Sequence, residues 1–196
     1  MNLFAAFDFV NIFLAVFLCA LVYFRDPSGK LNRYFLLITL VSCYCALCEF
    51  FKLIALNQEQ AILWHKASFL WPFLPFIFYL FVLIQTESKL YSNKILNFLI
   101  FLPGLFIALL HLFTNVLYTN ITYHWYGWEY NDAQNIFSAF VAIYFSLCGL
   151  FPVAIAIHYY IKQEIERKKK QTLFTISGLL IPVAAGIITR GILPQF

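Results

Sequence analysis

The chain has 196 residues, of which 63% are hydrophobic and 11% are charged, and its mean hydropathy is +0.81. A soluble domain is roughly half apolar and a quarter charged, so this chain folded in water would expose far too much apolar surface. The net charge of +4 does not indicate a nucleic-acid partner, because the basic residues fall in short clusters between apolar runs.

The apolar runs predict six membrane-spanning helices, since a helix needs about 20 apolar residues to cross the hydrocarbon core. They lie at residues 3–24, 34–56, 62–86, 95–116, 135–161 and 171–188. The first has no basic segment before it, which argues against a cleaved signal peptide. We therefore predict an all-α polytopic transmembrane bundle that forms one domain over residues 1–196, located in the cytoplasmic (inner) membrane of a cell.

The orientation follows from the basic residues between the spans. Ten of the 13 lie after the first, third and fifth spans: Arg25, Lys30, Arg33, Lys89, Lys94, Lys162, Arg167, Lys168, Lys169 and Lys170. The opposite side holds Lys52, Lys66 and Arg190. The positive-inside rule places the first set in the cytoplasm and the N-terminus outside. With six spans the C-terminus is also expected outside.

The second and third spans carry the first candidate binding residues, near their outer ends. Glu49 and Lys52 are three residues apart and can pair on one helical face, either as a self-neutralised interfacial pair or with Glu49 facing an outward cavity. Trp64 and Trp71 fit an outer aromatic belt. Pro72 and Pro75 predict a bend just inside the outer leaflet, and such a bend can open a crevice for a small molecule.

A polar and aromatic loop is expected at residues 117–134, between the fourth and fifth spans. It carries Trp125, Gly127, Trp128 and Glu129, and Gly127 would let the backbone turn. One interpretation is a lid over an outward-facing pocket, and the other is a loop whose rings lie among the headgroups. Asp8, in the first span, is either an interfacial polar residue or a further contact of the same kind.

No metal or catalytic arrangement is indicated. Cys43, Cys45 and Cys48 do not share one helical face, and all five cysteines lie within apolar runs, which argues against disulfides. His111 and His158 are expected to form hydrogen bonds within the bundle. We find no nucleophile–base pair, phosphate loop or paired carboxylates, so we predict neither a cofactor nor catalysis.

Motifs of Trp, Pro, Gly and aromatic residues occur in a recognisable order and spacing along most of the chain. They are Glu49, Trp64, Trp71, Pro72 and Pro75, then Pro103, Gly127 and Trp128, then Gly178, Pro182, Gly186 and Pro194. This order resembles the N-terminal seven-helix membrane region of bacterial and archaeal sensor histidine kinases. The resemblance implies a signal-input module that responds to a ligand or membrane state at its outer half.

Two departures from that family pattern stand out. The chain ends where the seventh helix would begin, and no kinase or other output domain follows. A C-terminus on the outside could not join a cytoplasmic output directly, so we expect a chain that is incomplete at its C-terminus.

Two other function classes remain as alternatives. A small transporter or channel subunit is compatible with six spans and several prolines, although inverted repeats and a midplane polar cluster are lacking. An integral-membrane enzyme ranks last, because the cytoplasmic face carries mostly Lys and Arg. The expected partners are the lipid bilayer, a small-molecule ligand, a cytoplasmic signalling output domain and, as an open alternative, a second copy of the chain in a homodimer.

Overall fold

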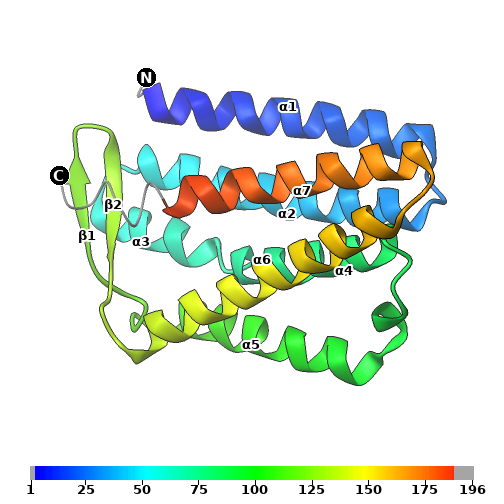
Figure 1. Ribbon diagram of the computed structural model, residues 1–196. Coiled ribbons are helices and arrows are strands. Elements are labelled where there is room, and N and C mark those ends of the chain that lie inside the picture. Colours follow the sequence, from blue (N-terminus) through cyan, green and yellow to red (C-terminus); the bar gives the residue numbers. More distant parts are fainter. Residues whose placement is uncertain (1–2, 188–196) are drawn as a thin grey trace.

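The computed structural model describes residues 3–187 and consists of helices with one β-hairpin (Figure 1). The α-helices are α1 (Leu3–Arg25), α2 (Lys30–Leu53), α3 (Gln58–Ala67), α4 (Leu74–Gln85), α5 (Lys94–Phe113), α6 (Ile136–Lys162) and α7 (Glu166–Ile187). Two short 3-10 helices are η1 (Trp71–Phe73) and η2 (Lys89–Ser92), and the strands are β1 (Tyr118–His124) and β2 (Gly127–Asp132).

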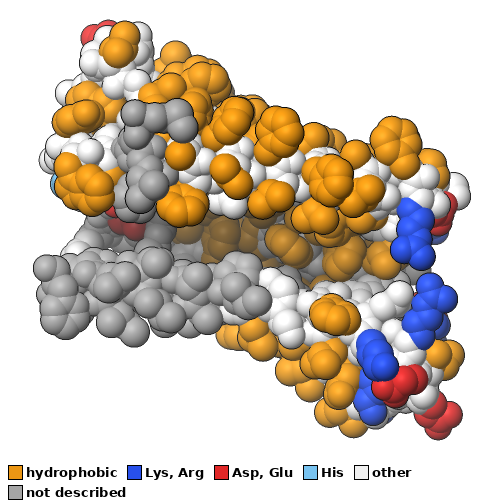
Figure 2. All heavy atoms as spheres, turned by 90° about the horizontal axis from the view of Figure 1, so that it is seen from above, with side chains coloured by type: hydrophobic (Ala, Val, Ile, Leu, Met, Phe, Trp, Pro, Cys, Tyr) orange, Lys and Arg blue, Asp and Glu red, His pale blue; other side chains and the backbone are white. Residues whose placement is uncertain are grey.

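The helices confirm a polytopic membrane protein. Five stretches of the described chain are long and apolar enough to cross a membrane: α1, α2, α3 through α4, α5 and α6. Many large apolar side chains are exposed, and they are spread along the face of the bundle that Figure 2 shows, where a bilayer would surround them. The sixth expected span lies in α7, which begins with charged residues and is not among the five, and residue 188 of that span lies outside the described residues.

Successive spans run in opposite directions, which gives the bundle two chemically different ends (Figure 1). One end, here called the hairpin end, holds β1, β2 and the connection between α2 and α3. The other, the basic end, holds the connections after α1, α4 and α6 and gathers Lys and Arg side chains (Figure 2). The fold therefore places on one end the ten basic residues that the sequence assigned to one side.

The expected third span is not one continuous helix. It is divided into α3, η1 and α4, because Pro72 and Pro75 cannot donate backbone hydrogen bonds and their rings clash with the preceding turn. Side-chain hydroxyls satisfy carbonyls freed at the break: Tyr44 donates to the Ala67 oxygen at 2.5 Å, and Tyr144 donates to the Pro72 oxygen at 3.2 Å. The bend expected at the prolines is confirmed, and it becomes a full interruption of the helix.

The expected loop at residues 117–134 contains an antiparallel β-hairpin. The strands pair from Tyr118 opposite Asp132 to His124 opposite Gly127, with an irregularity between Tyr118 and Ile121. Tyr118 and Ile121 are buried against Ala61 of α3, and the two residues between them are exposed, since the irregularity in the strand sets the buried residues three apart. The expected connection between the two spans is present, and the sequence did not indicate its strands, which form because one face of this segment has a helix to pack on.

Candidate functional site

The hairpin is docked on the last residues of α2. The indole N–H of Trp128 donates to the Ala55 carbonyl oxygen at 2.8 Å. Gly127 has a φ of +119°, and a Cβ atom there would lie 2.5 Å from the Leu53 carbonyl oxygen. Only glycine combines that backbone conformation with so close an approach, so Gly127 fixes where the hairpin meets α2.

Lys52 of α2 is a buried cation beneath the hairpin. Its side chain is 2% exposed and its Nζ lies 2.5 Å from Oε1 of Glu49, whose side chain is 45% exposed. The same Nζ lies 4.9 Å from the centre of the Tyr130 ring on β2. A buried ammonium needs such partners, and the arrangement confirms the predicted Glu49–Lys52 pair.

Tyr130 contacts the first of two buried histidines that pack against each other. Its ring centre lies 4.2 Å from that of His65 on α3, and the His65 ring lies 4.6 Å from the ring of His111 on α5. The Nε2–H of His111 donates to the main-chain oxygen of His65 at 2.7 Å. The hydrogen bond expected for His111 within the bundle is therefore confirmed, and it joins α5 to α3.

The contacts end at the proline break. The Trp71 ring in η1 lies 5.9 Å from the His111 ring, edge to face, and 5.0 Å from Phe145 of α6. Trp71 packs on the buried cluster of Ile107, Tyr144 and Cys148 rather than outward in a belt. We call the series Glu49, Lys52, Tyr130, His65, His111 and Trp71 the polar chain.

The six predicted binding residues do not all meet at one point. Glu49 and Trp71 are the two ends of the polar chain, and Trp128 anchors the hairpin. Trp64 lies apart from them and stacks on Phe51 at 4.5 Å. Glu129 is exposed, accepts a hydrogen bond from Tyr126 and lies 3.9 Å from His124.

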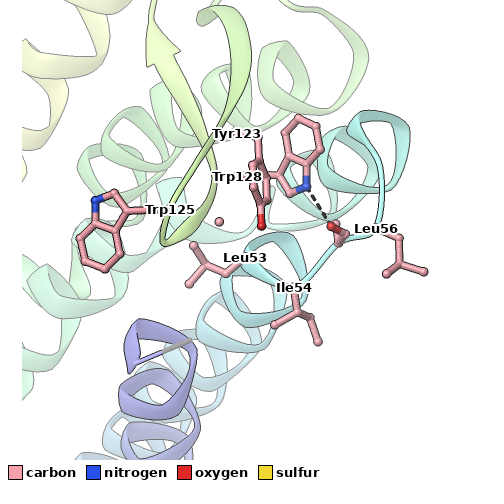
Figure 3. A pocket seen from close by; sticks show the side chains of 8 residues that line it. Leu53, Ile54, Leu56, Tyr123, Trp125 and Trp128 are labelled. Atoms are coloured by element: carbon pink, nitrogen blue, oxygen red, sulfur yellow. Dashed lines mark hydrogen bonds between the residues drawn. The ribbon is translucent and has the colours of Figure 1, made fainter. Parts of the chain in front are cut away.

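Trp125 stands at the hairpin tip and borders an open groove of about 510 Å³ (Figure 3). One wall is the end of α2 and the residues that follow it, and the other is the hairpin; the lining residues are Leu53, Ile54, Ala55, Leu56, Tyr123, Trp125, Gly127 and Trp128. A groove of this size can hold a small molecule.

Two tyrosines of the hairpin have raised pKa values. The hydrogen bond to the Glu129 carboxylate raises the pKa of Tyr126 to about 12, since it favours the neutral phenol. Burial raises the pKa of Tyr118. These groups therefore supply hydrogen bonds and ring surfaces rather than acid–base chemistry.

Metal chemistry finds no support in the part of the chain that the structure describes. No group of three or more His, Cys, Asp or Glu side chains there could hold a metal ion. The five cysteines are all free thiols.

Sequence reasoning missed the central members of the polar chain. His65 and Tyr130 were not singled out, and the burial of Lys52 was not foreseen. The available signal was their place near span ends and in the aromatic loop, but nothing in the sequence indicates that residues 52, 65, 111 and 130 converge.

A family model described as the N-terminal 7TM region of histidine kinase matches residues 9–195. No curated protein and no solved structure matches the chain.

Proposed function

The chain belongs to the family of N-terminal 7TM regions of histidine kinases, and from this premise we propose that its hairpin end reads a small-molecule ligand or a membrane state for a cytoplasmic output domain. In this proposal the chain lies in the cell's inner membrane, with the hairpin end outside and the basic end in the cytoplasm. The signal would be a small helix displacement, as is common in switching proteins.

The polar chain is the observation that carries this proposal. It connects the hairpin, through Tyr130, to His65 on α3 and His111 on α5, and reaches Trp71 at the break between α3 and α4. A ligand that moves the hairpin therefore displaces groups that touch three helices at once. Because the helix is interrupted at Pro72, α4 has freedom to respond at that point.

From the break, α4 leads to the basic end and to α7. Val82 of α4, Ala156 of α6 and Ile176 of α7 form one buried cluster. Just beyond α4, Glu87 accepts a hydrogen bond from Lys168 in the first turn of α7 at 2.6 Å. Helix α4 therefore contacts α7, the last helix that the structure describes, and a displacement of α4 would be passed to it.

The test displaces the hairpin without a ligand and measures the basic end. Spin labels are attached at Ser92 and Glu164, both exposed there, in a variant whose five cysteines are replaced. Gly127→Ala must shift the hairpin away from Leu53, whereas Gly178→Ala adds a methyl group that meets nothing within 4 Å. The proposal expects the label-to-label distance to change by about 1–2 Å in Gly127→Ala and not in the control.

A distance that stays the same in Gly127→Ala, while the fluorescence of Trp125 and Trp128 shows that the hairpin has moved, contradicts the proposal. That result would leave the hairpin as a static cover of the bundle.

A further inference from the structure

The groove beneath the hairpin tip is bordered by rings that are exposed rather than packed away. Trp125 is 81% exposed and Tyr123 is 67% exposed, and Leu56 on the facing wall is 89% exposed. In Figure 3 the Tyr123 and Trp128 rings stand on one side of the hairpin and Trp125 on the other, above Leu53 and Ile54. The groove therefore offers aromatic faces and aliphatic side chains together, which suits an occupant with an apolar part.

The net charge of the whole hairpin end favours a cation, although no carboxylate within residues 3–187 lines the groove itself. Among the described residues, the hairpin end carries five carboxylates against two lysines; the carboxylates are Asp8, Glu49, Glu59, Glu129 and Asp132, and the lysines are Lys52 and Lys66. Lys52 and Glu49 neutralise each other at 2.5 Å, which leaves four carboxylates against Lys66. An anionic ligand would approach this end against the local field, and a cationic one would approach with it.

The backbone adds to the same preference. Helix α2 ends at Leu53, so the negative end of its dipole, equivalent to about half an electron charge, borders the groove. Aromatic faces attract organic ammonium ions, which shed water more readily than metal cations do. Rings, helix end and carboxylates thus favour the same kind of head group.

We propose that the groove between residues 53–56 and the hairpin tip binds an organic ammonium ion that carries a short apolar tail. The ammonium group lies against the rings of Tyr123 and Trp128, which contact each other at 5.2 Å, and the tail lies along Ile54 and Leu56. This inference rests on the proposed function, since the ammonium compound would be the signal that the hairpin reads.

The experiment titrates the intact chain, in nanodiscs of neutral lipid, with three probes of equal tail length: hexyltrimethylammonium, hexanol and hexyl sulfate. Binding is followed by saturation-transfer NMR, and signals from empty nanodiscs are subtracted. The ammonium probe should bind about tenfold more tightly than hexanol, with hexyl sulfate weakest. Equal affinities for the three probes overturn the proposal and leave the rings as an ordinary membrane-interface surface.

Variants separate ring chemistry from apolar area. Tyr123→Leu keeps an apolar side chain and should lose the preference for the ammonium probe over hexanol, whereas Tyr123→Phe should retain most of it. Leu56→Ala should weaken the binding of both probes. Leu63→Ala truncates an exposed leucine outside the groove and should change the affinity of neither. An ammonium preference that survives in Tyr123→Leu contradicts the assigned site.

The two proposals fail separately. Ammonium binding in the groove with no change in the Ser92–Glu164 distance supports the site and contradicts the signalling role. A distance that responds to Gly127→Ala without ammonium selectivity supports the signalling role and contradicts this ligand class.

Discussion

Lys52 holds its ammonium nitrogen 4.9 Å from the centre of the Tyr130 ring, and 78 residues of chain separate the two. This contact ties the β-hairpin to the end of α2, and the Glu49 carboxylate holds the same nitrogen from the other side. The relationship matters because a buried ammonium group needs such partners to offset its lost hydration.

Replacement of Lys52 by methionine should destabilise the protein. Met keeps the apolar stem but removes the cation–ring attraction, worth about 2 kcal/mol at a desolvated site. Thermal unfolding of the purified chain in detergent should therefore show a lower midpoint for Lys52→Met. Lys94→Met, at an exposed position of the basic end, is the control and should leave the midpoint unchanged. Equal midpoints in the two variants would count against a supporting role for Lys52.

The variants His111→Gln and His111→Leu should differ in thermal stability, because Gln can still donate a hydrogen bond to the His65 carbonyl. That oxygen also accepts from the Ser68 hydroxyl at 2.7 Å, so it keeps a partner when His111 is lost. The loss in His111→Leu is therefore limited to roughly 1 kcal/mol, the net worth of one hydrogen bond. The midpoint of thermal unfolding should be close to that of the natural protein for His111→Gln and lower for His111→Leu. A reversed order would show that ring volume, not the hydrogen bond, is what matters at this position.

Gly104→Ala should destabilise the bundle at the proline break. A Cβ atom there would lie 2.7 Å from the Tyr144 hydroxyl oxygen and 3.1 Å from the Pro72 carbonyl oxygen. Overpacking of this kind costs about 1–3 kcal/mol. In a Tyr144→Phe background the nearer contact is gone, so the same Gly104→Ala change should cost less. If the double variant instead loses unfolding free energy equal to the sum of the two single losses, the direct contact is contradicted.

The pH response of the hairpin should include a late ionisation of Tyr126. Its pKa is raised to about 12, so the stabilisation from its bond to Glu129 is complete below its ordinary value of 10.0 and is lost as pH rises towards 12. The phenolate absorbance difference between the natural protein and Tyr126→Phe isolates this group. Glu129→Gln should move the midpoint back towards 10, and a midpoint that does not move would exclude the carboxylate as the cause.

The orientation of the chain can be tested by cysteine labelling in intact cells. In a cysteine-free background, Trp125→Cys at the hairpin tip should react with a membrane-impermeant maleimide from outside. Glu164→Cys at the basic end should react only after the membrane is permeabilised, because the positive-inside rule places it in the cytoplasm. The opposite pattern would place the groove on the cytoplasmic side and remove the basis for an outward sensor.

The first five spans, their order and a bend at Pro72 and Pro75 could be predicted from the sequence alone. Lipid imposes a fixed length of apolar helix, and proline removes a backbone donor wherever it stands, so both signals are local. The Glu49–Lys52 pair is local in the same sense, since residues three apart on a helix are always neighbours.

The convergence of Lys52, Tyr130, His65 and His111 was decided only by the tertiary structure. Apolar periodicity is weak when both lipid and protein interior are apolar, so the sequence does not tell which side of each helix faces a neighbour. For that reason Trp64 and Trp71, which look alike in the sequence, have different places, one stacked on Phe51 and the other against His111. The hairpin likewise depends on α3, because Tyr118 and Ile121 pack on Ala61 of that helix. Ala61 lies more than 50 residues away from them in the chain.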